Sequence, residues 1–180
     1  MVRIISTKLQ SPQPEVDTDR ELADHDLKYL VDFLSTSRST RYELIERPDE
    51  QVQGRPAPDY LLRDSRTGRI IAVEHTLLMD EDVQRSVARR MKAGAEIVTV
   101  GPKTIDPREI GQALHEAVAR KLARGQLNGV AADERILLMR NRIFATAKTY
   151  LGAQLNFTFG DRTGIDSAYL IASRHLLELW

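Results

Sequence analysis

The stretch PDYLLRDSRTGRIIAVEHTLL, residues 58–78, decides the fold of this 180-residue chain. Residues 58–64 and 69–78 are rich in aromatic, β-branched and other large apolar side chains, which predicts two strands. Between them, residues 65–68 (Ser-Arg-Thr-Gly) are typical of a turn, with glycine where a left-handed backbone conformation is often needed. The stretch therefore predicts an antiparallel β-hairpin.

Two acidic residues face each other across this predicted hairpin. If the turn is Ser65 to Gly68, the numbers of paired residues keep a constant sum, and Asp59 pairs with Glu74. Paired side chains lie on the same face, with Cβ atoms about 4.5–5.5 Å apart. Thr76 shares that face of its strand, two residues beyond Glu74. A shift of the register by one residue would place the two acids on opposite faces.

Such a pair is costly unless something compensates its charge. Like charges directly opposed destabilise a sheet, and Asp and Glu are poor strand formers. Mg²⁺, with Mn²⁺ as a substitute, is the natural compensating ion, because it binds one or two carboxylates together with waters and phosphate oxygens. The alternative is that the acids lie at a solvated sheet edge or pair with Arg55, Arg63 or Arg69.

The rest of the chain predicts an α/β protein with a single domain over residues 1–180. The prolines of residues 1–17 favour a tail or an edge strand. Asp106-Pro107 is a strong helix start, and Gly125 is a natural stop for that helix. Helices are expected over 18–34, 80–92, 106–123 and 143–151, and further strands over 42–46, 97–100, 134–140, 168–173 and 176–180.

Pro58-Asp59, followed after fourteen residues by Glu74-His75-Thr76, resembles the signature of the PD-(D/E)XK nuclease superfamily, which has the restriction-endonuclease-like fold. The resemblance covers about residues 18–140. It implies an αβββαβ core with a mixed central sheet flanked by helices, to which this chain adds a helical insertion, Asp80 to Lys103. The final segment, 141–180, is expected to add a helix and a pair of strands.

The resemblance also implies roles for individual residues. Asp59 and Glu74 would be metal ligands, and an acid early in the first helix would supplement them. Glu21 is the best-placed candidate for that third ligand and Asp24 the second.

The sequence departs from the family's pattern where the family has a lysine two residues after the second acid. Thr76 occupies that position here and cannot supply a positive charge. Some members import the basic group from a nearby helix. The candidates in this chain are Lys121, Arg120, Lys92 and Arg89.

A basic stripe on the predicted helix over residues 80–92 offers contacts to nucleic acid. Arg85, Arg89 and Lys92 recur at helical spacing and suit phosphate contact. A solvated face that complements the helix C-terminus is the alternative. His75 follows Glu74 and should point to the opposite face of the sheet, in a structural role.

Composition narrows the other possibilities. The chain has no cysteine, which excludes disulfides, cysteine-ligated metals and thiol nucleophiles. The formal net charge is zero, so no global field attracts nucleic acid or lipid. No apolar run reaches the roughly 18 residues of a membrane span, and residues 1–10 lack a signal-peptide core, so we expect a cytoplasmic protein with no membrane partner.

Three functions remain open from the sequence. The leading one is a Mg²⁺-dependent nuclease that hydrolyses phosphodiester bonds, with DNA a better expected partner than RNA. The second is a catalytically inactive module of the same fold that binds nucleic acid or protein. The third is an α/β protein without a nucleic-acid role, and a homodimer is left open in each case.

Overall fold

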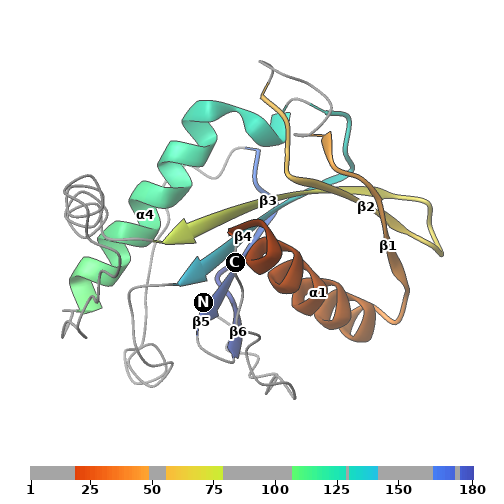
Figure 1. Ribbon diagram of the computed structural model, residues 1–180, viewed down its shortest axis with the longest axis horizontal. Helices are drawn as coiled ribbons and strands as arrows, with labels where there is room; N and C mark the ends of the chain where they lie inside the picture. The colour runs from red at the N-terminus through yellow and green to blue at the C-terminus, as the bar shows by residue number, and fades with distance from the viewer. Residues whose placement is uncertain (1–18, 49–55, 79–106, 129, 142–163, 173–174) are drawn as a thin grey trace, which may run out of the picture.

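The computed structural model describes residues 19–48, 56–78, 107–128, 130–141, 164–172 and 175–180, and these form an α/β structure with a six-stranded mixed sheet and two helices (Figure 1). The predicted tail 1–17, the helices 80–92 and 143–151 and the strand 97–100 lie outside these residues. In chain order the elements are α1 (Asp19–Ser37), β1 (Tyr42–Glu46), β2 (Tyr60–Asp64), β3 (Ile70–Leu78), α4 (Pro107–Arg124), the 3₁₀ turn η1 (Gln126–Asn128), β4 (Glu134–Asn141), β5 (Ser167–Ala172) and β6 (His175–Glu178).

The strands lie in the sheet in their sequence order, from β1 to β6. The pairs β1–β2, β2–β3 and β5–β6 are antiparallel, whereas β3–β4 and β4–β5 are parallel. The crossover from β3 to the parallel strand β4 includes α4, as parallel neighbours require a long connection. The sheet is therefore a parallel centre flanked by antiparallel pairs.

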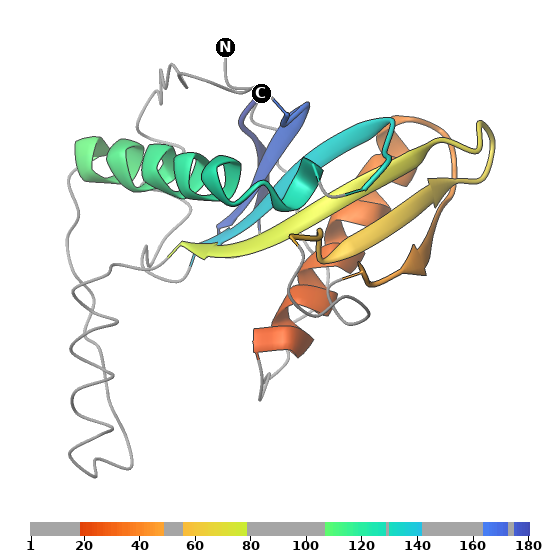
Figure 2. The ribbon, with the colours of Figure 1, turned by 90° about the horizontal axis from the view of Figure 1, so that it is seen from above.

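The two helices cover opposite faces of the sheet (Figure 2). Leu27, Leu30 and Leu34 of α1 recur at helical spacing and are buried in one apolar cluster. That cluster also includes alternate residues of strands β2 to β5, whose side chains point to the α1 face, among them Leu62, Val73, Ile136 and Leu138. The second cluster contains Leu114, Ala117 and Val118 of α4. These pack on the intervening strand residues, which point to the opposite face of the sheet, among them Leu61, Ala72, Leu137 and Met139. The central strands β3, β4 and β5 are thus buried on both faces of the sheet.

The predicted hairpin and its register are confirmed. Tyr60 pairs with Val73, and Arg63 pairs with Ile70. In both pairs the residue numbers have the same sum, as the turn Ser65 to Gly68 implies. Gly68 has a φ of 73°, which an L side chain rarely adopts. The amides of Arg66 and Thr67 donate to Asp64 Oδ1 at 2.8 and 3.2 Å, which stabilises the turn. β2 begins at Tyr60, so Asp59 directly precedes the strand that was predicted over 58–64.

Helix α1 extends past its predicted end at residue 34 to Ser37. Thr36 Oγ1 donates to the Asp32 carbonyl at 2.9 Å, and Ser37 Oγ donates to the Leu34 carbonyl at 3.3 Å. These bonds satisfy two polar side chains of the last helical turn, beyond the predicted end of the helix. The other described boundaries differ from the predicted ones by no more than two residues.

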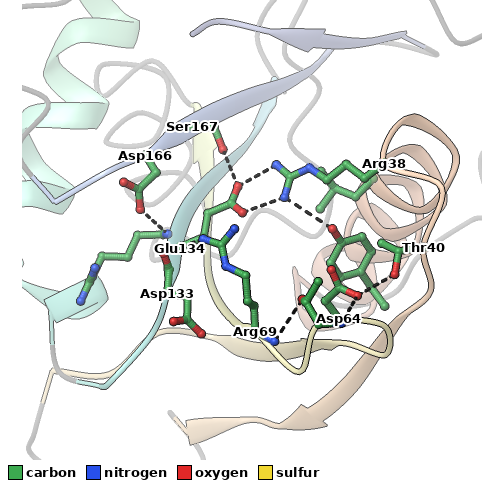
Figure 3. A network of polar contacts seen from close by, with 12 residues as sticks. Arg38, Thr40, Asp64, Arg69, Asp133, Glu134, Asp166 and Ser167 are labelled. Carbon is green, nitrogen blue, oxygen red and sulfur yellow. Dashed lines mark hydrogen bonds and ion pairs between the residues drawn. The ribbon is translucent and has the colours of Figure 1, made fainter.

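A polar network joins α1 to the ends of β2, β4 and β5 (Figure 3). The Arg38 guanidinium donates to both carboxylate oxygens of Glu134 at 2.7 Å, a bidentate pair that links the helix C-terminus to the start of β4. Ser167 Oγ donates to the same carboxylate at 3.5 Å. These residues lie where β4 and β5 begin, whereas Glu74 lies further along the sheet, in the middle of β3 and opposite Leu137 of β4.

Candidate active site

Asp59 and Glu74 lie on the α4 face of the sheet, next to the last paired residues of the hairpin. Tyr60 pairs with Val73, so the register continued by one residue places Asp59 opposite Glu74. The alternation of side chains along each strand places both acids on this face. Leu61 lies two residues after Asp59 and Ala72 two residues before Glu74, and both belong to the cluster under α4. The His75 amide donates to Asp59 Oδ2 at 2.6 Å, which holds the Asp59 carboxylate against β3.

Glu74 is buried, with a relative exposure of 0%. Its Oε1 atom accepts a hydrogen bond and forms an ion pair with Lys121 Nζ, from the last turn of α4. Lys121 Nζ also donates to Gln126 Oε1 of η1 at 3.4 Å. Lys121 was one of four candidates for a replacement basic group, and the structure places it against the carboxylate.

The helical spacing of α4 explains why Lys121 reaches the sheet. Leu114, Ala117 and Val118 form the buried stripe of the helix, and Lys121 follows at the next position of that stripe. Its alkyl chain therefore continues along the apolar face, and its amine reaches Glu74 where the apolar cluster ends.

The ionisation of Glu74 is balanced near neutral pH. Burial and, secondly, the negative charge of Asp59 raise the pKa of Glu74, the positive charge of Lys121 lowers it, and together they bring it to about 7. A buried carboxylate with such a pKa, adjacent to a second acid and a lysine, is characteristic of sites that bind cations or transfer protons.

The second carboxylate oxygen of Glu74 has no hydrogen-bond partner in the described structure. Glu74 Oε2 is buried, while Oε1 is held by Lys121. A buried carboxylate oxygen is costly to leave without a donor or a cation. A hard divalent ion that binds one or two carboxylates fits this donor set, in which Glu74 Oε2 and the Asp59 carboxylate would be the ligands.

The structure does not bring Glu21 to this pair. Glu21 is exposed near the start of α1, the helix on the opposite face of the sheet. Among the described residues, no group of three or more His, Asp or Glu side chains is close enough to hold a metal ion. Asp24, the second candidate, instead accepts hydrogen bonds from Tyr60 Oη at 2.9 Å and from Arg47 Nη2 at 3.1 Å.

The remaining predicted residues divide into two groups. Thr76 is partly exposed on β3, and its side chain is on the same face of the sheet as that of Glu74. Arg85, Arg89 and Lys92 lie outside the residues that the structure describes.

A buried charged network on the α1 face was not predicted. The Asp26 carboxylate accepts a hydrogen bond from Arg140 Nη1 at 2.7 Å and lies 3.0 Å from His75 Nε2. Asp26 and Arg140 are 0% and 5% exposed, and His75 points to this face, as predicted. The sequence did carry a signal, because Asp26 lies three residues after Ala23 and four before Leu30, on the buried stripe of α1.

Comparison with known proteins found no family model, no curated protein and no solved structure that matches the chain. Among the described helices, none is both long and apolar enough to span a membrane.

Proposed function

We propose that the protein is a Mg²⁺-dependent nuclease with a restriction-endonuclease-like fold, whose active site contains Asp59, Glu74 and Lys121. One observation carries this proposal: Lys121 of α4, 47 positions after Glu74 in the chain, contacts the carboxylate of Glu74, which faces Asp59 across the hairpin. Thr76 occupies the position where the resembled family has its lysine, and Lys121 is placed to provide the missing charge.

Each side chain has a separate task in this proposal. Asp59 and the free Oε2 of Glu74 would hold the metal, and Glu74 Oε1 keeps Lys121 in place. When bound, Mg²⁺ supplies positive charge to the scissile phosphate and to the attacking water. The Lys121 amine adds a second positive group, which stabilises the negative charge that develops during cleavage. DNA is the proposed substrate in preference to RNA.

Cleavage assays with matched variants test the proposal. Labelled duplex, single-stranded and branched DNA, and RNA, are incubated with the wild type in Mg²⁺, Mn²⁺ or EDTA. We expect metal-dependent cleavage that Glu74→Ala abolishes and Lys121→Met lowers by about a hundredfold or more, which is a typical effect of losing one charge-stabilising group. Arg124→Met, an exposed residue one turn later in α4, is the control and should cleave normally.

Metal binding is measured separately, by calorimetry with Mn²⁺. Asp59→Asn should weaken binding, whereas Lys121→Met should retain it, because the lysine is not a metal ligand. If the metal-loaded wild type cuts none of the substrates, the enzyme proposal fails.

The same geometry favours a second candidate, a catalytically inactive module of this fold. Lys121 already compensates the charge of Glu74, and this ion pair requires no metal. Salt-dependent binding of nucleic acid without cleavage, and without Mn²⁺ binding, would support this second candidate over the first.

A further inference from the structure

Two turns far apart in the sequence meet at the end of the sheet that points away from α4 (Figure 2). One is the β2–β3 turn, and the other is the α1–β1 connection, residues 38–41. Ser65 donates to the Arg41 carbonyl through both its amide, at 2.8 Å, and its Oγ, at 2.9 Å. Thr40 Oγ1 donates to Asp64 Oδ1 at 2.6 Å, so side-chain and backbone bonds fix the two turns together.

These turns and the adjoining end of β2 present three exposed arginines, Arg41, Arg63 and Arg66, which we call the arginine edge. Within the described part of the chain, no hydrogen bond or ion pair engages their guanidinium groups. Other arginines nearby differ: Arg38 is paired with Glu134, and Arg69 donates to the Asp133 carbonyl at 3.2 Å. In the part of the chain that the structure describes, the guanidinium groups of the arginine edge are therefore exposed and not engaged by an acid.

The acids closest to these arginines leave the surface basic. Asp64 is buried, and its carboxylate accepts bonds from Thr40 and from the amides of the turn. Two described acids near the arginine edge are exposed: Glu43, which pairs with Arg63 across β1 and β2, and Asp133, whose carboxylate accepts from the Ile70 amide at 2.8 Å. Among the described residues, the three exposed arginines outnumber these two exposed acids, and a cluster of arginines suits a ligand with several regularly spaced negative charges.

The arginine edge continues the face that carries the candidate active site. Arg63 has the same parity as Leu61 and Asp59, so it lies on the α4 side of β2. Four residues of strand separate Arg63 from Asp59, a distance of about 13 Å at 3.3 Å per residue. A nucleic-acid strand advances about 3.4 Å per nucleotide, so this distance corresponds to about four nucleotides.

We propose that the arginine edge binds the phosphate backbone of a nucleic acid about four or more nucleotides away from the candidate active site. This inference rests on the proposed function for the identity of the ligand, and it goes further by stating which surface holds the substrate outside the acid pair. Guanidinium groups bind phosphate oxygens through paired N–H donors, and such contacts position the strand without reading its sequence.

Equilibrium binding tests this proposal without cleavage. Fluorescence anisotropy is measured with labelled 20-nucleotide DNA, single-stranded and duplex, in EDTA and over a range of NaCl concentrations. The triple variant Arg41→Gln, Arg63→Gln, Arg66→Gln should bind at least tenfold more weakly, and its salt slope should fall by about 2–3, close to one per lost phosphate contact. Glu43→Gln should bind more tightly than the wild type, because it removes an exposed acid that lies next to Arg63.

The control is a triple variant with the same charge change elsewhere, Arg20→Gln, Lys28→Gln, Arg124→Gln, whose residues are exposed on α1 and α4. It should bind DNA as the wild type does. Melting temperatures of all variants establish that they are folded.

The outcomes separate this proposal from the proposed function. If both triple variants bind like the wild type, or both lose affinity equally, the arginine edge is not the binding surface, and the nuclease proposal is unaffected. If the edge variant loses binding to anionic lipid vesicles while its DNA binding is unchanged, the ligand is a membrane surface and the proposal is wrong. If binding behaves as expected but the wild type cleaves nothing, the nuclease proposal fails and the arginine edge stands.

Discussion

Glu74 should make the metal-free protein less stable as the pH rises from 5 to 7. Burial, and secondly the charge of Asp59, raises the pKa of Glu74 from 4.5 to about 7 in the folded protein. Between these values the folded state binds more protons than the unfolded state, so the free energy of unfolding falls with increasing pH. The contribution of the protonated Glu74 is fully present below pH 4.5 and is lost as the pH passes 7.

The magnitude follows from the shift. Each pKa unit corresponds to about 1.4 kcal/mol, so the full effect is about 3 kcal/mol, of which about 2 kcal/mol falls between pH 5 and pH 7. His25 titrates in the same range, and burial lowers the pKa of its imidazole, which gives the opposite slope. The difference in the free energy of unfolding between the wild type and Glu74→Gln isolates Glu74, because His25 and the other titrating groups are present in both proteins.

Urea denaturation in EDTA at pH 5, 6 and 7 measures this difference. The wild type should lose about 2 kcal/mol relative to Glu74→Gln over the range, whereas Glu43→Gln, an exposed acid of β1, should parallel the wild type. Parallel curves for the wild type and Glu74→Gln would refute the reasoning, because they would show that Lys121 keeps Glu74 ionised in the folded protein throughout.

Three further results are expected. A hundredfold excess of Mn²⁺ over Kd should stabilise the wild type by about 2.7 kcal/mol, and Asp59→Asn should lose most of the melting shift; an unchanged shift would place the metal elsewhere. Asp26→Ala should cost about 3–5 kcal/mol in urea denaturation, because it leaves the Arg140 charge buried without its partner, and a loss below 1 kcal/mol would show that the network is not buried in solution. Gly68→Ala should cost about 1–2 kcal/mol from its positive φ alone, since no atom lies within 4 Å of the added Cβ, and a stabilised variant would contradict the turn geometry.

The hairpin register could be predicted because its determinants are local. The turn residues Ser65 to Gly68 set which residues pair, and the alternation of strand side chains then sets which of them share a face. The ends of α4 were predictable for the same reason, since Pro107 begins the helix and Gly125, with a φ of 64°, follows its last residue.

The partners of the site residues depend on tertiary structure. The sequence alone favoured Lys121 but left Arg120, Lys92 and Arg89 as further candidates for the basic group, because spacing along the chain does not state which helix face packs on which sheet face. α4 packs on the Ala72 side of β3, and that packing brings Lys121 to Glu74. It also separates Glu21 from the pair, since α1 packs on the other side.

By itself, therefore, the sequence determined the order of the elements, the hairpin register and the juxtaposition of Asp59 with Glu74, all of which arise from interactions within a few residues of backbone and one turn. Only the tertiary structure decided which cation meets Glu74, that Asp26 joins His75 and Arg140, and that Arg41 lies beside the β2–β3 turn. These contacts join residues 24 to 114 positions apart. Their formation depends on how whole helices and strands bury their apolar faces, which no local pattern specifies.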